Sequence, residues 1–189
     1  LRMKLVGFAG YSGSGKTSLV EPLVALMRDK GLRVSVIKHA HHRFDIDHEG
    51  KDSWRHRKAG AYEVLIASDT RLALMREFPQ PLELTVHDMV AELDAAVDWV
   101  LVEGFKYGDV PKIEIWRQLP DAASSASANT RTRTPLYPVD GNVIAVATDD
   151  VSALPVPPSQ PVLDLNQPAS VLQWLLEQGE RLQYQAPQH

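Results

Sequence analysis

The sequence contains no cysteine, few aromatic residues and no long apolar run. The absence of cysteine excludes disulfide bonds, thiolate zinc sites and a cysteine nucleophile, and it is typical of a protein in a reducing compartment. No apolar stretch approaches the roughly 20 residues needed to cross a bilayer. Only a handful of apolar residues precede Gly10, fewer than the apolar core of a signal peptide requires. From these absences we expect a cytoplasmic protein.

The net charge of the whole chain is also small, but the charged residues are unevenly distributed along it. The 189 residues include 20 Lys and Arg and 24 Asp and Glu, a formal net charge of −4. That balance argues against a nucleic-acid coat protein and against a polybasic membrane anchor. Residues 1–60 contain 12 basic and 6 acidic residues, whereas residues 61–189 contain 8 and 18. This split indicates that the first third of the chain binds an anionic ligand.

Strand-like and helix-like apolar patterns alternate along the chain. The expected strands cover residues 4–9, 34–37, 62–67, 72–78, 99–102, 112–117, 143–147 and 162–165. The expected helices cover residues 16–30, 51–59, 84–96 and 169–178. Pro22 lies unfavourably inside the first of these helices, because an interior proline removes a hydrogen bond. The alternation predicts an α/β three-layer sandwich with a mainly parallel sheet, and residues 62–78 predict an additional β-hairpin.

The length and the hydrophobic content of 44 % suit one self-sufficient domain. We expect this domain to span residues 1–178 and to be followed by a C-terminal tail, residues 179–189. Residues 119–135 are rich in Ala, Ser and Thr, and we expect them to form a mobile insertion.

The most informative motif is Gly-Tyr-Ser-Gly-Ser-Gly-Lys-Thr at residues 10–17, which fits the phosphate-loop pattern G-x-x-x-x-G-K-[ST]. Glycines let backbone N–H groups converge on phosphate oxygens, and the following helix directs its N-terminus at the same anion. Lys16 is expected to reach the β- and γ-phosphates, and the Thr17 hydroxyl to ligate Mg²⁺. The motif lies between an expected strand and an expected helix, so it predicts a nucleoside triphosphate site with a P-loop NTPase-like fold. The expected nucleotide-binding residues are Gly10, Ser12, Gly13, Ser14, Gly15, Lys16, Thr17, Ser18 and Gly50.

Two carboxylates are candidates for the metal and water side of this site. Glu103 ends the apolar run Val100-Leu101-Val102, and a carboxylate at a strand end can hold Mg²⁺ beside Thr17. Asp47 lies in a polar loop that follows the second expected strand, at the sheet edge where such folds bind ligands. We expect Asp47 to act with Lys16 in catalysis, although Asp45 fits the same role.

The loop of residues 39–50 also permits other interpretations. It contains His39, His41, His42 and His48, which could form a transition-metal site and make the protein a metal-insertion GTPase. The simplest interpretation of this segment is a solvated polar loop. A small-molecule or nucleotide kinase is a further alternative, with Arg131 and Arg133 as candidates for a cationic lid. The base-reading motif Asn-Lys-x-Asp of common GTPases is missing from residues 145–150, so guanine selectivity does not follow from these residues.

Several segments together resemble the molybdopterin-guanine dinucleotide biosynthesis adapter proteins, the MobB family. The resemblance covers residues 4 to about 178, and its most specific part is the histidine-rich segment followed by Gly-Lys-Asp-Ser. The matching segments are residues 10–17, 37–42 through Asp45 and Asp47 to 50–53, 57–61, 67–68, Arg71 with 73–75, 102–106, 112–114 and 143–147.

The resemblance implies a P-loop GTPase-like fold, GTP binding with weak hydrolysis, and a homodimer. It also implies an accessory role beside the molybdopterin guanylyltransferase that attaches GMP to molybdopterin, together with other molybdenum cofactor biosynthesis proteins. The family role carries onto residues 13–17 for phosphate binding.

Overall fold

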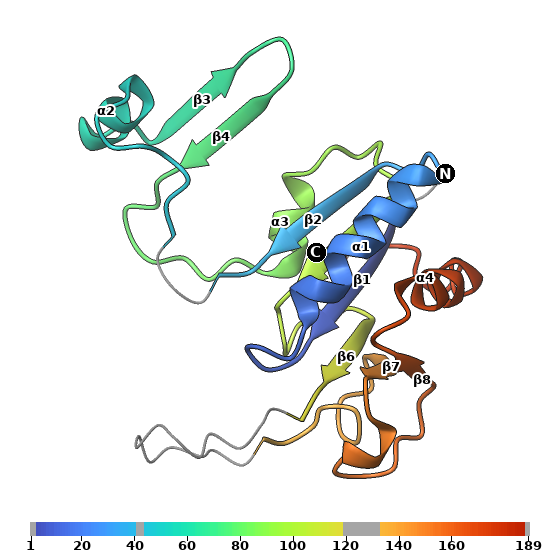
Figure 1. Ribbon diagram of the computed structural model, residues 1–189. Coiled ribbons are helices and arrows are strands. Elements are labelled where there is room, and N and C mark those ends of the chain that lie inside the picture. The colour runs from blue at the N-terminus through green and yellow to red at the C-terminus, as the bar shows by residue number, and fades with distance from the viewer. Residues whose placement is uncertain (1–2, 41–43, 119–132, 188–189) are drawn as a thin grey trace. The chain divides into compact units, whose positions relative to one another are not determined.

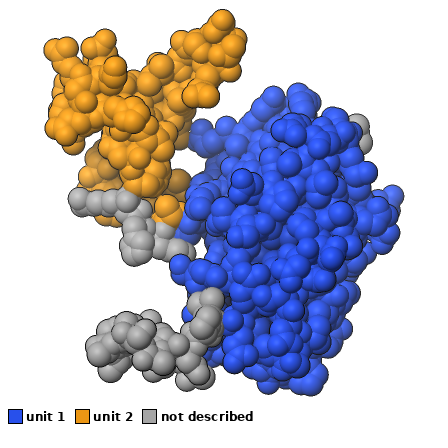
Figure 2. Space-filling view, in the orientation of Figure 1, with its two compact units in different colours: residues 1–39, 85–189 blue, residues 40–84 orange. Residues whose placement is uncertain are grey.

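The structure is a computed structural model that describes residues 3–40, 44–118 and 133–187. The chain forms two compact units, shown in different colours in Figure 2. Unit 1 consists of residues 1–39 and 85–189, and unit 2 consists of residues 40–84. Most of the expected insertion, residues 119–132, lies outside the described residues. Within the described ranges, no helix is long and apolar enough to span a bilayer.

Unit 1 is built on a six-stranded parallel sheet with the order β2-β5-β1-β6-β7-β8. The strands are β1 (Lys4–Ala9), β2 (Val34–Lys38), β5 (Trp99–Glu103), β6 (Lys112–Trp116), β7 (Val143–Thr148) and β8 (Val162–Asp164). The helices are α1 (Lys16–Asp29), α3 (Val86–Ala91), the 3₁₀ helix η1 (Val151–Ala153) and α4 (Pro168–Glu177). The predicted α/β class with a parallel sheet is therefore confirmed.

Both faces of the sheet are covered, so its central strands are buried along their whole length (Figure 1). Helices α1 and α4 pack on one face, where Phe8 and Leu101 meet Leu23 and Leu175. Helix α3 packs on the other face through Val86 and Val90, against alternate residues of β1 and β5. Since successive side chains of a strand point to opposite faces, the side chains of β1 and of β5 are divided between these two clusters.

Two helices differ in detail from the pattern read in the sequence. Helix α1 continues through Pro22 without a break. Helix α3 is shorter than the predicted 84–96, because Thr85 and Asp88 form a capping box that starts it and the chain turns after Glu92. The Asp94 carboxylate then accepts the N–H of Ala96, 2.8 Å away, which is a turn rather than a helical contact.

The segment after α4 packs against the beginning of β1. Leu182 is buried in the same core as α1 and α4, and its carbonyl accepts the N–H of Leu5 at 2.9 Å. The N–H of Tyr184 donates to the carbonyl of Met3, also at 2.9 Å. Residues predicted as the start of a tail thus contribute backbone pairing and apolar contacts to unit 1.

Unit 2 contains helix α2 (Asp52–Lys58) and an antiparallel hairpin of β3 (Glu63–Ala67) and β4 (Leu72–Arg76). The predicted hairpin is confirmed, although β4 ends at Arg76 rather than at residue 78. The unit is held together by the Arg57 guanidinium, which pairs with Asp45, Asp47 and Glu77 at 3.0, 3.1 and 2.6 Å.

A buried carboxylate orders the chain that follows the expected insertion. Both Glu114 oxygens accept the N–H of Leu136, and one also accepts the N–H of Tyr137, at 2.7 to 2.9 Å. Burial raises the pKa of Glu114, while these hydrogen bonds from the backbone favour its ionised form. Immediately upstream, Thr134 exchanges two hydrogen bonds with the hydroxyl of Tyr11 in the phosphate loop.

Replacing Glu114 by glutamine should lower the free energy of unfolding by about 1–3 kcal/mol, because an amide has one acceptor oxygen and leaves a buried N–H poorly matched. Urea unfolding followed by circular dichroism measures this change. The exposed Glu180→Gln variant is the matched control and should unfold as the parent does. Equal stability of the two variants would contradict the assigned role of Glu114.

The carboxyl end of β1 leads directly into a close backbone approach. Gly10 has φ 148°, and a Cβ atom placed there would lie 2.5 Å from the carbonyl oxygen of Ile115 in β6. Gly31, after α1, also has a positive φ of 78°, but a Cβ there would meet nothing within 4 Å.

The Gly10→Ala variant should therefore be destabilised by more than the backbone strain of about 1–3 kcal/mol that a positive φ imposes on alanine. Gly31→Ala changes a glycine of positive φ with open space around it and should be destabilised less. The larger fall in the thermal midpoint of Gly10→Ala reports the close approach to β6 together with its different φ. If both variants unfold at the same temperature, the contact with Ile115 does not constrain the loop.

Candidate nucleotide-binding site

The predicted phosphate loop and the predicted metal carboxylate end two neighbouring strands. Strands β1 and β5 run parallel, with Phe8 of β1 opposite Glu103 of β5. The loop of residues 10–15 follows β1, so it leaves the sheet beside Glu103. In open α/β sheets, ligands bind at this carboxyl edge. The local sequence places each feature at a strand end, and the pairing of the strands brings the two features together.

The loop has the backbone geometry of an anion cradle. Gly13 and Gly15 have φ values of 78° and 98°, in the region that favours glycine. Gly15 is also the N-cap of α1, and it offers no side chain to the first N–H groups of the helix. The first turn of α1 contains no acidic residue. The N-terminus of this 14-residue helix therefore keeps both its dipole and its free donors for an anion.

The side chain of Ser14 is an independent sign of a missing ligand. Its residue is 3 % exposed, and its hydroxyl oxygen is buried without a hydrogen-bond partner within the described part of the chain. A buried hydroxyl without a partner is costly, so native proteins rarely leave one unexplained. A phosphate oxygen in the loop would supply an acceptor. Both the backbone conformation of the loop and its hydrogen-bond donors therefore fit a bound phosphate.

Lys16 is folded back onto the loop that precedes it. Its ammonium donates to the carbonyl oxygens of Gly10 and Tyr11, both at 2.8 Å. Burial lowers the pKa of Lys16, and this effect is opposed by the carboxylate of Glu103 and reinforced by the ammonium of Lys38. Lys16 therefore lies beside the cradle with its charge partly removed from water, and it must release these carbonyls to reach a phosphate.

Thr17 and Glu103 meet as the sequence predicts for a metal pair. The Thr17 hydroxyl donates to Oε1 of Glu103 at 2.7 Å, across 86 residues of sequence. Glu103 is 8 % exposed, and Oε1 also faces the ammonium of Lys38 at 3.4 Å. A carboxylate and a hydroxyl are oxygen ligands of the kind that Mg²⁺ prefers. These two side chains could hold a Mg²⁺ ion together with phosphate oxygens and water.

The other predicted phosphate-loop residues lie around this centre. Ser12 and Ser18 are exposed, the first in the loop and the second in the first turn of α1.

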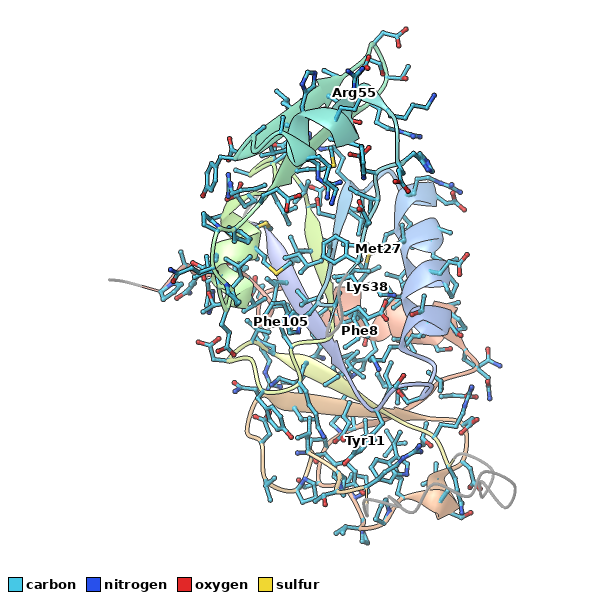
Figure 3. All side chains as sticks on the ribbon, turned by 90° about the vertical axis from the view of Figure 1, so that its left-hand side faces the viewer. Phe8, Tyr11, Met27, Lys38, Arg55 and Phe105 are labelled. Atoms are coloured by element: carbon cyan, nitrogen blue, oxygen red, sulfur yellow. The ribbon has the colours of Figure 1, made fainter. Side chains whose placement is uncertain are left out.

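Figure 3 labels Tyr11 beyond the end of β1. Its ring lies 4.1 Å from the ammonium of Lys106 and 5.4 Å from the guanidinium carbon of Arg133. Arg131, which was considered with Arg133 for a kinase lid, lies outside the described residues.

Sequence reasoning did not identify Lys106 and Arg117 beside the loop. Lys106 follows Phe105, the one non-glycine residue with a positive φ (47°) among those described, so a tight turn after β5 directs it back toward Tyr11. A guanidinium nitrogen of Arg117 lies 3.4 Å from the position of a Cβ on Gly15, and Arg117 pairs with Asp149 at 2.6 Å. Neither position follows from a local pattern.

Asp47 and Gly50, both predicted as site residues, belong to unit 2. Burial disfavours ionisation of Asp47, but hydrogen bonds from Ser53 and Arg57 hold the pKa of its carboxyl below the ordinary value. The Ser53 hydroxyl donates to Oδ1 at 2.8 Å and Arg57 approaches Oδ2 at 3.1 Å. Gly50 has φ 85° in a turn with open space around it. Within unit 2, Asp47 orders the loop around Arg57.

The histidines of the 39–50 loop are divided in the structure. His39 lies in unit 1, where its ring stacks on Phe105 with centroids 4.4 Å apart. His48 lies in unit 2, and His41 and His42 lie outside the described residues. The ranges that the structure describes contain no group of three or more His, Cys, Asp or Glu side chains arranged to hold a metal ion.

Comparison with known proteins identifies the family. The sequence pattern of the MobB family, described as molybdopterin guanine dinucleotide synthesis protein B, matches residues 5–149. The molybdopterin-guanine dinucleotide biosynthesis adapter protein of Haemophilus influenzae is 41 % identical over 166 residues, covering 87 % of this chain and 83 % of the relative. The adapter protein of Escherichia coli is 37 % identical over 181 residues, covering 93 % and 95 %.

Solved structures agree with this relationship. The X-ray crystal structure of a MobB protein homolog from Bacillus stearothermophilus has a TM-score of 0.62 and 26 % identity, covering 94 % of this chain and 98 % of that one. The crystal structure of Bacillus subtilis MobB shares the fold, with a TM-score of 0.65, 24 % identity and coverage of 93 % and 97 %. On the extent of these matches, the chain belongs to the MobB family.

Proposed function

We propose that this protein is a GTP-binding adapter in molybdopterin-guanine dinucleotide biosynthesis, with weak GTPase activity. The observation that carries the proposal is the contact of Thr17 with Glu103 beside an intact phosphate loop, in a chain of the MobB family. The pathway follows from the relatives, which are named as adapter proteins of that biosynthesis. The choice of guanine over adenine rests on the family and not on a base-reading motif.

Different residues of the site would bind different parts of the nucleotide and its metal ion. Backbone N–H groups of residues 13–17 and the Ser14 hydroxyl would surround phosphate oxygens, while Lys16 would exchange its two loop carbonyls for the β- and γ-phosphates. Thr17 and Glu103 would hold Mg²⁺, which supplies charge neutralisation on the phosphates when bound. Each of these groups already lies at the carboxyl edge of the sheet.

Slow hydrolysis is consistent with the ion pairs that two arginines, Arg57 and Arg117, already make within the protein. The sequence-based candidate for orienting water, Asp47, is held within unit 2, where Ser53 and Arg57 bind its carboxylate. Arg57 pairs with three carboxylates and Arg117 with one. A free arginine supplied to the phosphates accelerates such reactions by about 10³–10⁵-fold. The protein would therefore act mainly by holding GTP for the guanylyltransferase that attaches GMP to molybdopterin.

The Lys16→Ala variant should bind GTP with Mg²⁺ about 10- to 100-fold more weakly than the parent, since a hydrogen bond to a charged group contributes about 1.5–3 kcal/mol. Titration of a fluorescent GTP analogue, with unlabelled GTP and ATP as competitors, measures both affinity and base preference. Lys30→Ala, an exposed lysine just after α1, is the matched control. Equal affinity of the parent and Lys16→Ala would refute the phosphate-loop assignment.

We also propose that the protein is a homodimer that pairs through unit 2. Leu65, Leu72 and Leu74 share one face of the β3–β4 hairpin and are 60, 66 and 43 % exposed. In the described residues, neither strand of this hairpin has a second neighbour. An isolated two-stranded hairpin with an exposed apolar face is marginally stable. The same hairpin of a second copy offers matching open edges and a matching apolar face.

The Leu65→Asp variant should dissociate this dimer, because it places a charge in the centre of the apolar face. Sedimentation equilibrium over a range of protein concentrations measures the dissociation constant. Val139→Asp changes an 81 % exposed apolar residue of unit 1 and should leave the oligomeric state unchanged. A parent protein that sediments as a monomer at all concentrations would overturn the proposal.

A further inference from the structure

A second lysine, Lys38, reaches the carboxylate of the proposed metal site. Lys38 is the last residue of β2 and lies opposite Glu103 in the parallel register of β2 and β5. Its ammonium is 3.4 Å from Oε1 of Glu103, the same oxygen that accepts the Thr17 hydroxyl. The proposed ligand of Mg²⁺ is therefore already bound to a cation of the protein itself.

The burial of the two partners is very unequal. The Glu103 side chain is 10 % exposed and the Lys38 side chain is 62 % exposed. A nearly buried carboxylate requires a compensating charge, and Lys38 supplies it from the solvent side. The backbone of Lys38 is fixed, because the N–H of the next residue, His39, donates to the carbonyl of Glu103 at 2.9 Å. Its long exposed side chain remains able to turn while its position on the strand does not change.

The charges around Glu103 are not balanced. Lys16 and Lys38 both act on this carboxylate, and the two ammonium groups oppose one another, since Lys38 contributes to lowering the pKa of Lys16. Within the part of the chain that the structure describes, the hydrogen bonds of the Lys16 ammonium go to the neutral carbonyls of Gly10 and Tyr11. Two cations against one carboxylate leave an excess positive charge at the mouth of the phosphate loop. Such a cluster attracts a polyanion and repels a metal ion that arrives alone.

We propose that Lys38 is a positioning residue that couples the binding of Mg²⁺ to the binding of the triphosphate. Without nucleotide, its ammonium is paired with the Glu103 carboxylate and competes with a divalent cation for it. When the triphosphate arrives, Lys38 turns to the phosphates and leaves Glu103 and Thr17 to the metal. This inference rests on the proposed nucleotide site and deepens it, because it makes the binding of the metal and the binding of the nucleotide depend on each other.

Coupling of this kind requires that removal of Lys38 affect the two ligands in opposite directions. The Lys38→Ala and Lys38→Gln variants should bind Mn²⁺ alone about 2- to 5-fold more tightly and GTP in the presence of EDTA about 2- to 5-fold more weakly, as expected for an ion pair whose lysine is mostly exposed. Lys38→Arg keeps the charge and should change both affinities less. Lys30→Ala should change neither.

The metal affinity is measured with Mn²⁺ by electron paramagnetic resonance, with Glu103→Gln defining the signal that does not depend on the site. The GTP affinity is measured with a fluorescent analogue in EDTA. Thermal unfolding of every variant reports on folding, and Lys38→Gln retains part of the side chain if Lys38→Ala is unstable. Opposite changes in the two affinities support the inference, and changes in the same direction or no change overturn it.

The outcome for the proposed function is separate. If the parent binds GTP and Lys16→Ala does not, the nucleotide site stands even when Lys38 has no effect. If the parent does not bind GTP in either condition, the proposed function fails, and the coupling role of Lys38 fails with it.

Discussion

The parallel pairing of β1 with β5 is the constraint on which the candidate site depends. Thr17, the last residue of the phosphate-loop motif, and Glu103 are 86 residues apart in the sequence. The motif contains no carboxylate, so the carboxylate must come from another segment. Because the two strands run side by side in the same direction, their carboxyl ends deliver a loop of N–H donors and a carboxylate to one edge. Strand β2 extends the same arrangement by one strand and adds Lys38. Three strand ends thus bring together the candidate anion cradle, the candidate metal ligand and a second cation.

Burial determines how strongly these groups act on each other. Glu103 is nearly buried and Lys16 is partly buried, so their charges are less screened than those of surface residues. The unpartnered hydroxyl of Ser14 and the uncapped start of α1 leave hydrogen-bonding capacity directed at the same place. The loop and the start of α1 are thus arranged for an anion, whereas Lys16 and Lys38 are held by groups of the protein itself.

Much of this could be predicted from local sequence patterns. The spacing of Gly10, Gly15 and Lys16 predicts a loop that leads into a helix, and the apolar run ending at Glu103 predicts a buried strand, since both patterns depend only on neighbouring residues. The predicted extent of α3, residues 84–96, was wrong. Apolar periodicity continues beyond Glu92, but the Asp94 side chain makes a turn there. Lys106 could not be found in this way, because its approach to Tyr11 depends on a backbone turn at Phe105.

The sequence by itself determined the phosphate loop, the alternation of strands and helices, and the unequal distribution of charge along the chain. These features arise from hydrophobic periodicity, glycine conformations and composition, which act over a few residues. Only the tertiary structure decided that Thr17 and Lys38 share one oxygen of Glu103, and that Asp47 is paired with Arg57 in a separate compact unit. Strand order and register are set by the packing of the whole chain, so contacts between distant residues follow from them and not from any single motif.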